Sequence, residues 1–125
     1  MPRILIVDDV STIRKIVTAV LGGVGYQVTE SASAADALAI CETRGFHLLL
    51  VDVEMPEMNG LELISRLRTL KNTRSTPIVI LAKDGRDENI RRAETLGANG
   101  WIEKPFTPER LLSAINQVLV DHYVN

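Results

Sequence analysis

Cysteine is nearly absent from this chain, since Cys41 is the only one among 125 residues. A single thiol excludes an internal disulfide, and the position of Cys41 in an apolar helical pattern favours a buried thiol in a reducing compartment. A catalytic role for this thiol is disfavoured, because no reactive microenvironment is visible around it.

The chain also lacks a long hydrophobic run and an excess of one charge. The apolar segment near the N-terminus is too short for a signal peptide or a membrane span, so we expect a cytoplasmic protein without membrane insertion. Sixteen acidic and fourteen basic residues give a net charge of -2, with both signs scattered, which does not indicate direct nucleic-acid binding. No linker, repeat or low-complexity segment is present, so we expect one domain over residues 1–125.

Short aliphatic runs alternate with helical periodicity along the whole chain, which predicts an α/β fold of five parallel strands flanked by five helices. The expected strands are residues 4–7, 27–31, 48–51, 78–81 and 100–102. Three runs, the first, third and fourth, are almost purely aliphatic, which predicts central strands buried on both faces. The other two are better edge candidates. Apolar spacings of three and four predict a helix after the first strand, with Ser11 as its N-cap.

Three aspartates fall where strands are expected to end: Asp8 and Asp9 after the first strand, and Asp52 after the third. In an open parallel sheet, ligands bind outside the carboxyl ends of the strands, where the winding reverses. Each aspartate alone could be an ordinary turn or helix-capping residue. Together, two carboxylates roughly 5 Å apart would repel by about 3 kcal/mol at an effective dielectric constant of 20, so a compensating positive charge is expected.

Two sources of positive charge are available. Mg²⁺, held by carboxylates and a phosphate, is the commonest intracellular solution for an oxygen-rich site. Lys104 follows the fifth strand and precedes Pro105, which pushes the lysine toward extended geometry, although a solvated surface lysine is the alternative. Such a set of groups could form an aspartyl phosphate by attack of a carboxylate on phosphorus. The residue types do not say which of the three aspartates is the nucleophile.

The motifs together resemble the response-regulator receiver family, and especially its CheY-like chemotaxis members. The matching segments, in order and each at an expected strand end, are Asp8-Asp9, Asp52-Val53-Glu54-Met55-Pro56 with Asn59-Gly60, and Lys104-Pro105-Phe106. The resemblance spans essentially the whole chain. It implies a flavodoxin-like, CheY-like sheet with the strand order 2-1-3-4-5.

The same resemblance implies roles for the site residues. Asp52 would be the phosphoryl acceptor and, with Asp9 as a direct ligand and Asp8 acting through water, would hold Mg²⁺. The backbone carbonyl of Glu54 would complete the protein ligands of the metal. Lys104 would contact a phosphoryl oxygen, and without metal it could instead approach Glu54.

The resemblance also points to a switch. The Lys104–Pro105 bond would be cis, and Trp101 would be the aromatic switch residue. Glu54 and Asp84 would flank the path by which water reaches the phosphoryl group. Ala82 departs from the family pattern, which has Thr or Ser there, so one phosphoryl hydrogen bond of about 1.5 to 3 kcal/mol would be lost and coupling between Asp52 and Trp101 weakened.

The implied function is a two-component signalling switch that catalyses its own phosphorylation and dephosphorylation but turns over no independent substrate. Its partners would be a histidine kinase or phosphotransfer protein and an output protein that binds the surface of the fourth helix, fifth strand and fifth helix. A constitutive interaction module is the alternative, which Ala82 would favour. A flavin or dinucleotide carrier is disfavoured because no Gly-rich loop follows the first strand. A haloacid-dehalogenase-type phosphatase would need aspartate where Glu54 stands.

Overall fold

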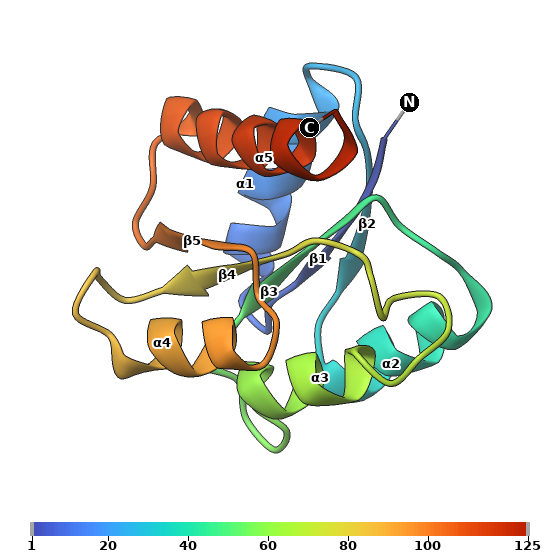
Figure 1. The fold of residues 1–125 in the computed structure, drawn as a ribbon. Helices are drawn as coiled ribbons and strands as arrows, with labels where there is room; N and C mark the ends of the chain where they lie inside the picture. The colour runs from blue at the N-terminus through green and yellow to red at the C-terminus, as the bar shows by residue number, and fades with distance from the viewer. Residues whose placement is uncertain (1, 125) are drawn as a thin grey trace.

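The structure, a computed structural model, describes residues 2–124 and contains a five-stranded parallel sheet between two layers of helices (Figure 1). The strands take the order β2-β1-β3-β4-β5, as the family resemblance predicts. Their bounds are β1 (Arg3–Val7), β2 (Gln27–Ser31), β3 (Leu48–Asp52), β4 (Ile78–Ala82) and β5 (Gly100–Glu103).

The aliphatic runs form the centre of the sheet, and the two more polar strands form its edges. All residues of β3 and β4 are buried, because helices cover both of their faces. In the β1–β3 pair Val7 lies opposite Val51, and in the β3–β4 pair Asp52 lies opposite Leu81. Asp8, which follows Val7, and Asp52, which follows Val51, therefore lie at the same carboxyl end of the sheet.

Two helices cover one face of the sheet, and three cover the other (Figure 1). The helices are α1 (Ser11–Gly22), α2 (Ala34–Thr43), α3 (Gly60–Leu67), α4 (Glu88–Thr95) and α5 (Pro108–Tyr123). Helices α1 and α5 pack Leu21 and Ile115 against one face, and α3 packs Ile64 against the other. Full burial of such a side chain contributes about 1.5 to 3 kcal/mol. Within residues 2–124, none of these helices has the length and apolar character of a membrane span.

Most helices begin after a polar side chain that accepts a hydrogen bond from the first turn. These N-caps are Ser33, Asn59, Asp87 and Thr107. The prediction for Ser11 is wrong, because Ser11 is already helical and the N-cap is Val10, whose side chain makes no cap. The Asp8 carboxylate instead accepts the N–H of Val10 at 2.9 Å. This Asx turn places the start of the helix at Ser11, so Ser11 is not in the position of an N-cap.

Cys41 lies buried on α2, as the apolar pattern around it predicts. Burial raises the pKa of its thiol to about 11, since the thiolate would lose its hydration. The thiol therefore stays protonated near neutral pH and packs as a small apolar group.

Candidate functional site

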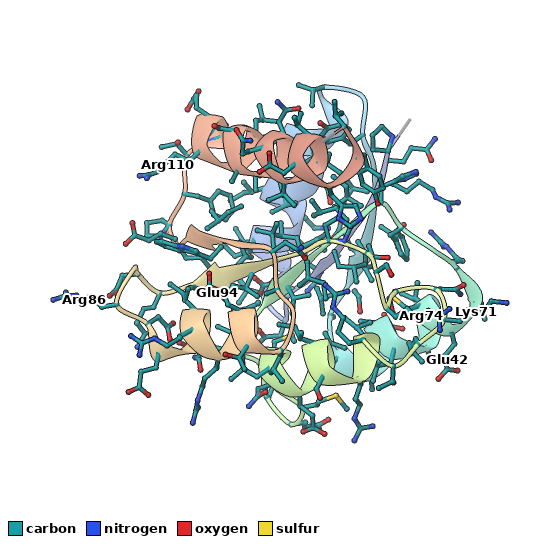
Figure 2. All side chains as sticks on the ribbon, viewed as in Figure 1. Glu42, Lys71, Arg74, Arg86, Glu94 and Arg110 are labelled. Atoms are coloured by element: carbon teal, nitrogen blue, oxygen red, sulfur yellow. The ribbon has the colours of Figure 1, made fainter. Side chains whose placement is uncertain are left out.

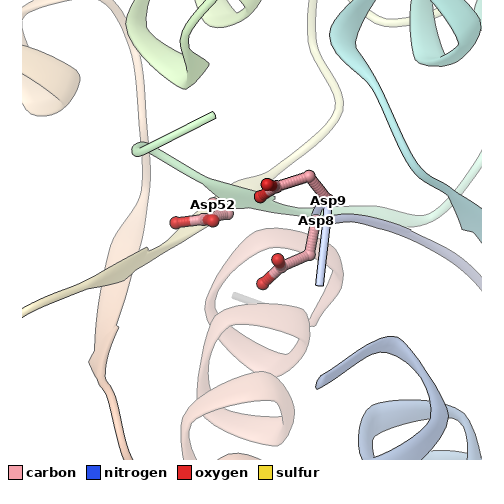
Figure 3. A group of neighbouring side chains, drawn as sticks. All are labelled: Asp8, Asp9 and Asp52. Atoms are coloured by element: carbon pink, nitrogen blue, oxygen red, sulfur yellow. The ribbon is translucent and has the colours of Figure 1, made fainter. Parts of the chain in front are cut away.

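The three aspartates predicted to gather at one edge of the sheet do so (Figure 3). Asp8 and Asp9 follow β1, and Asp52 is the last residue of β3. One carboxylate oxygen from each residue lies within 4.8 Å of the others. Asp8 and Asp52 are buried whereas Asp9 is exposed, so the cluster opens to solvent on the side of Asp9.

The carboxylate of Asp8 is only half satisfied by the protein. Its Oδ1 accepts the N–H of Val10, but its buried Oδ2 has no hydrogen-bond partner. Burial raises the pKa of Asp8 from 3.8 to about 6, with a smaller contribution from the negative charge of Asp52, while the Val10 N–H opposes the shift. An unpartnered buried carboxylate oxygen is costly, so this site is built for a group that the polypeptide does not supply.

Asp52 has more support from the protein. Its Oδ1 accepts hydrogen bonds from the backbone N–H of Glu54 and from Nζ of Lys104, both at 3.1 Å. Burial raises the pKa of Asp52, and these two donors oppose that effect. The Lys104 side chain keeps 27% of its surface exposed, whereas Asp52 keeps 2%, so the lysine brings a hydrated positive charge to a buried carboxylate.

This donor set fits a hard divalent cation. Mg²⁺ prefers oxygen ligands and is usually held by one or two carboxylates with several waters. The cluster offers carboxylate oxygens only, and one of them, Oδ2 of Asp8, is buried without a partner. A bound cation would remove the repulsion between the carboxylates and satisfy that oxygen.

The other predicted site residues surround the cluster. The Lys104–Pro105 peptide bond is cis, and the N–H of Lys104 donates to the carbonyl of Ala82 at 2.8 Å. Ala82 is buried at the end of β4 and brings no hydroxyl group to the site. Trp101 lies on β5 with 40% of its surface exposed, next to the β4–α4 loop, where a Cβ added to Gly85 would approach its ring to 3.3 Å.

Glu54 does not form the ion pair with Lys104 that could occur without metal. Lys104 pairs with Asp52 instead, because the buried carboxylate at the end of β3 lies within reach of its ammonium group. Glu54 is exposed and, with Asp84, lines a cavity of about 510 Å³ between its loop and the start of α4. The two residues expected to flank a solvent path therefore face the same hollow.

The contacts that Arg14, Glu30 and Gly60 make at the site were not predicted from the sequence, although Gly60 belongs to the motif quoted there. Arg14 donates from Nη1 to the backbone carbonyl of Asp8 at 2.7 Å, and Glu30 holds the same guanidinium at 3.3 Å. No sequence spacing indicates this contact, because Arg14 lies on α1 and Glu30 lies on β2. Gly60 lies directly against the Asp52–Val53 peptide.

Adding a methyl group at Gly60 should destabilise the protein. A Cβ there would lie 2.6 Å from Cα of Val53 and would also collide with the carbonyl oxygen of Asp52. We expect Gly60→Ala to lower the free energy of unfolding by about 2 kcal/mol, the usual cost of overpacking. Gly22→Ala is the matched control, because nothing lies within 4 Å of its new methyl group. Urea unfolding measures both, and equal stabilities would refute the steric argument.

Comparison with known proteins agrees with the fold. The chain matches the sequence profile of the response regulator receiver domain over residues 4–116. It is 34% identical over 117 residues to a probable chemotaxis protein CheY of Rhizobium etli. The aligned residues cover 93% of this chain and 91% of that protein.

Solved structures extend the similarity to three dimensions. The chemotaxis response regulator CheY4 of Vibrio cholerae superposes with a TM-score of 0.90 at 36% identity, covering 94% of this chain and 98% of that one. A CheY-like receiver domain protein from Methanospirillum hungatei gives a TM-score of 0.90 at 32% identity, covering 98% of this chain and 96% of that one. The profile, the relatives and the fold agree, and this chain belongs to the response regulator receiver domain family.

Proposed function

We propose that this receiver domain, as a single unit over residues 1–125, accepts a phosphoryl group on Asp52 in a Mg²⁺-dependent reaction. The observation that carries the proposal is the contact of Asp52, alone among the three clustered aspartates, with Lys104 at 3.1 Å. A carboxylate at the strand end, next to two more carboxylates and one ammonium group, combines a nucleophile with groups able to neutralise phosphoryl charge.

Each residue has a defined part in this reaction. A carboxylate oxygen of Asp52 forms the new bond to phosphorus, while the bond from phosphorus to the donor nitrogen of a phosphohistidine breaks and that nitrogen recovers its proton. Lys104 holds a phosphoryl oxygen by its ammonium group. Asp9 would bind the cation directly, Asp8 would bind it through water, and the backbone carbonyl of Glu54 would be a further ligand. When bound, Mg²⁺ supplies positive charge that offsets the phosphoryl oxygens.

The same groups would serve dephosphorylation. Water attacks the phosphorus of the aspartyl phosphate, and the bond from phosphorus to the Asp52 oxygen breaks. This returns the carboxylate and releases inorganic phosphate and a proton. Glu54 and Asp84 line one cavity between the loop after β3 and the start of α4. We propose that their charges influence how water reaches the phosphoryl group. We therefore propose a signalling switch that catalyses both of its own phosphoryl reactions and has no separate substrate.

The partners follow from this function. A histidine kinase or phosphotransfer protein supplies the phosphoryl group, and an output protein binds the α4-β5-α5 surface. Two hollows support that surface: one of about 670 Å³ over α4, and one of about 660 Å³ along β5 and α5. Arg86 and Arg110 extend from this side of the ribbon (Figure 2). A location in the cytoplasm stays a prediction.

Phosphorylation by a small donor tests the central proposal. The protein is incubated with acetyl phosphate in the presence of Mg²⁺ or of EDTA, and its intact mass is measured. We expect a single phosphoryl adduct that forms with Mg²⁺ and not with EDTA. An unchanged mass under both conditions would favour a constitutive interaction module with a receiver fold.

Restoring a hydroxyl group at the end of β4 should strengthen the response to phosphorylation. Ala82→Thr adds a donor where the structure has none, and a hydrogen bond to a charged group contributes about 1.5 to 3 kcal/mol. We expect the active form of the α4-β5-α5 surface to gain roughly ten- to hundredfold in population.

Amide chemical shifts of that surface, measured with and without beryllofluoride and Mg²⁺, report the change. Ala82→Val is the matched control, because valine has the shape of threonine without its hydroxyl group. An equal response in the threonine and valine variants would refute the role of the missing donor.

A further inference from the structure

Arg14 on α1 connects the acidic cluster to the edge of the sheet. Its Nη1 donates to the backbone carbonyl of Asp8 at 2.7 Å, and its Nε donates to Oε1 of Glu30, on β2, at 3.3 Å. Thr18, one turn further along α1, donates from Oγ1 to Oε2 of the same Glu30 at 3.0 Å. The side chains of Arg14 and Glu30 are only 16% and 30% exposed, so the network is largely shielded from water.

The carbonyl held by Arg14 belongs to the peptide group that joins Asp8 to Asp9. The other polar groups of Asp8 are also restrained, since its N–H donates to the carbonyl of Ser31 at 3.1 Å and its Oδ1 accepts the N–H of Val10. With the plane of this peptide fixed as well, the buried Oδ2 of Asp8 is held within the cluster. The N–H of this restrained peptide belongs to Asp9, so the position of the exposed Asp9 side chain also depends on it.

The positive charge of Arg14 does not by itself favour cation binding at the acidic cluster. A positive charge near a cation site weakens cation binding by Coulomb repulsion, and the Glu30 carboxylate paired with Arg14 offsets that charge. The geometric effect has the opposite sign, because groups that orient metal ligands typically raise metal affinity by about 10- to 100-fold. A variant that keeps the charge but loses these contacts should therefore bind Mg²⁺ more weakly if Arg14 orients the ligands. It should bind Mg²⁺ as the wild type does if only the charge of Arg14 matters.

We infer that Arg14, anchored by Glu30 and Thr18, is a positioning residue that orients the Asp8–Asp9 peptide for cation binding. The inference rests on the proposed Mg²⁺-dependent function. Arg14 has no contact with the phosphoryl acceptor among the hydrogen bonds described for residues 2–124, so its effect is expected on metal affinity rather than on the chemistry at Asp52.

Calorimetric titration of the metal-free protein with Mg²⁺ tests the inference without any phosphoryl donor. Arg14→Lys keeps the positive charge but cannot donate to Asp8 and Glu30 from one planar group. We expect its dissociation constant for Mg²⁺ to rise about tenfold. A constant equal to or below that of the wild type would overturn the inference.

A second variant, Arg14→Met/Glu30→Met, removes both charged groups of the pair. The net charge of the protein stays the same, and apolar replacements of a shielded ion pair usually fold well. We expect the same loss of Mg²⁺ affinity, and retention of wild-type affinity would again count against positioning. Free energies of unfolding, measured by urea without metal, separate this loss of affinity from a loss of fold.

The control is Arg66→Lys, which makes the same substitution in the exposed Arg66–Glu62 pair on α3. It should leave the Mg²⁺ affinity unchanged, and an equal loss there would refute a specific role for Arg14. If the wild type itself binds no Mg²⁺, the proposed function fails. If the wild type binds and the Arg14 variants bind equally well, only the positioning role fails.

Discussion

Replacement of Asp52 by asparagine should abolish phosphoryl uptake and leave the fold intact. The amide has nearly the shape of the carboxylate but is not a nucleophile, so the rate with acetyl phosphate and Mg²⁺ should fall by a factor on the order of 10⁴ or more. The fold should survive, because burial already penalises the charged form of Asp52 and because Lys104 retains contact with water.

Intact mass spectrometry of wild type and Asp52→Asn after the same incubation measures this effect. Asp36→Asn is the control, since Asp36 is a carboxylate in the first turn of α2, outside the acidic cluster. Its phosphorylation should equal that of the wild type. A persistent adduct on Asp52→Asn would identify Asp8 or Asp9 as the acceptor and refute the assignment made from the Lys104 contact.

The contribution of Asp8 to the stability of the metal-free protein should increase as the pH falls from 7 to 4. Because burial raises the pKa of Asp8 to about 6 from its usual 3.8, the folded protein binds a proton in this range that the unfolded chain does not. The stabilising effect of that proton is fully present below the unfolded pKa and is lost as the pH rises through the folded one. The difference amounts to about 3 kcal/mol.

Asp8→Asn isolates this contribution. The variant cannot ionise at this position, so at pH 7 it should be more stable than the metal-free wild type by about 3 kcal/mol, and the difference should disappear near pH 4. Urea unfolding at several pH values in EDTA gives both curves. Parallel curves across the whole range would show that Asp8 titrates as an ordinary aspartate.

Mg²⁺ should reverse the order of the two proteins at pH 7. At a concentration 1,000 times its dissociation constant, a ligand that binds only the folded state adds about 4.1 kcal/mol of stability. Wild type should gain this amount and Asp8→Asn much less, because it has lost a carboxylate of the cluster. The Asp8 carboxylate that the proposed function requires therefore lowers the free energy of unfolding of the metal-free protein.

Much of the fold could be predicted from the sequence, for a physical reason. Strands covered on both faces need continuous aliphatic runs, so β1, β3 and β4 were identifiable, and each expected strand lies within an observed one. The strand order was not readable from these runs, because one Leu/Ile/Val run resembles another, and it came from the family resemblance. The start of α1 was misassigned to a Ser11 cap because the turn is made by the side chain of Asp8.

The acidic cluster was predictable for a similar reason. Residues that directly follow parallel strands must emerge at one edge, so adjacency along the chain indicated that Asp8, Asp9 and Asp52 would meet. The contacts that orient them were not predictable. The Arg14–Glu30 pair and the choice of Lys104 between Asp52 and Glu54 depend on side-chain reach across separate elements, which no local pattern encodes.

The position of Trp101 gives this protein an intrinsic optical reporter. It is the only tryptophan of the chain, and its ring lies against Gly85 in the loop that connects β4 to α4. Any displacement of that loop changes the polarity around the indole ring. Emission spectra of the unlabelled protein can therefore follow the loop in real time, with the two tyrosines contributing little when excitation is set above their absorption band.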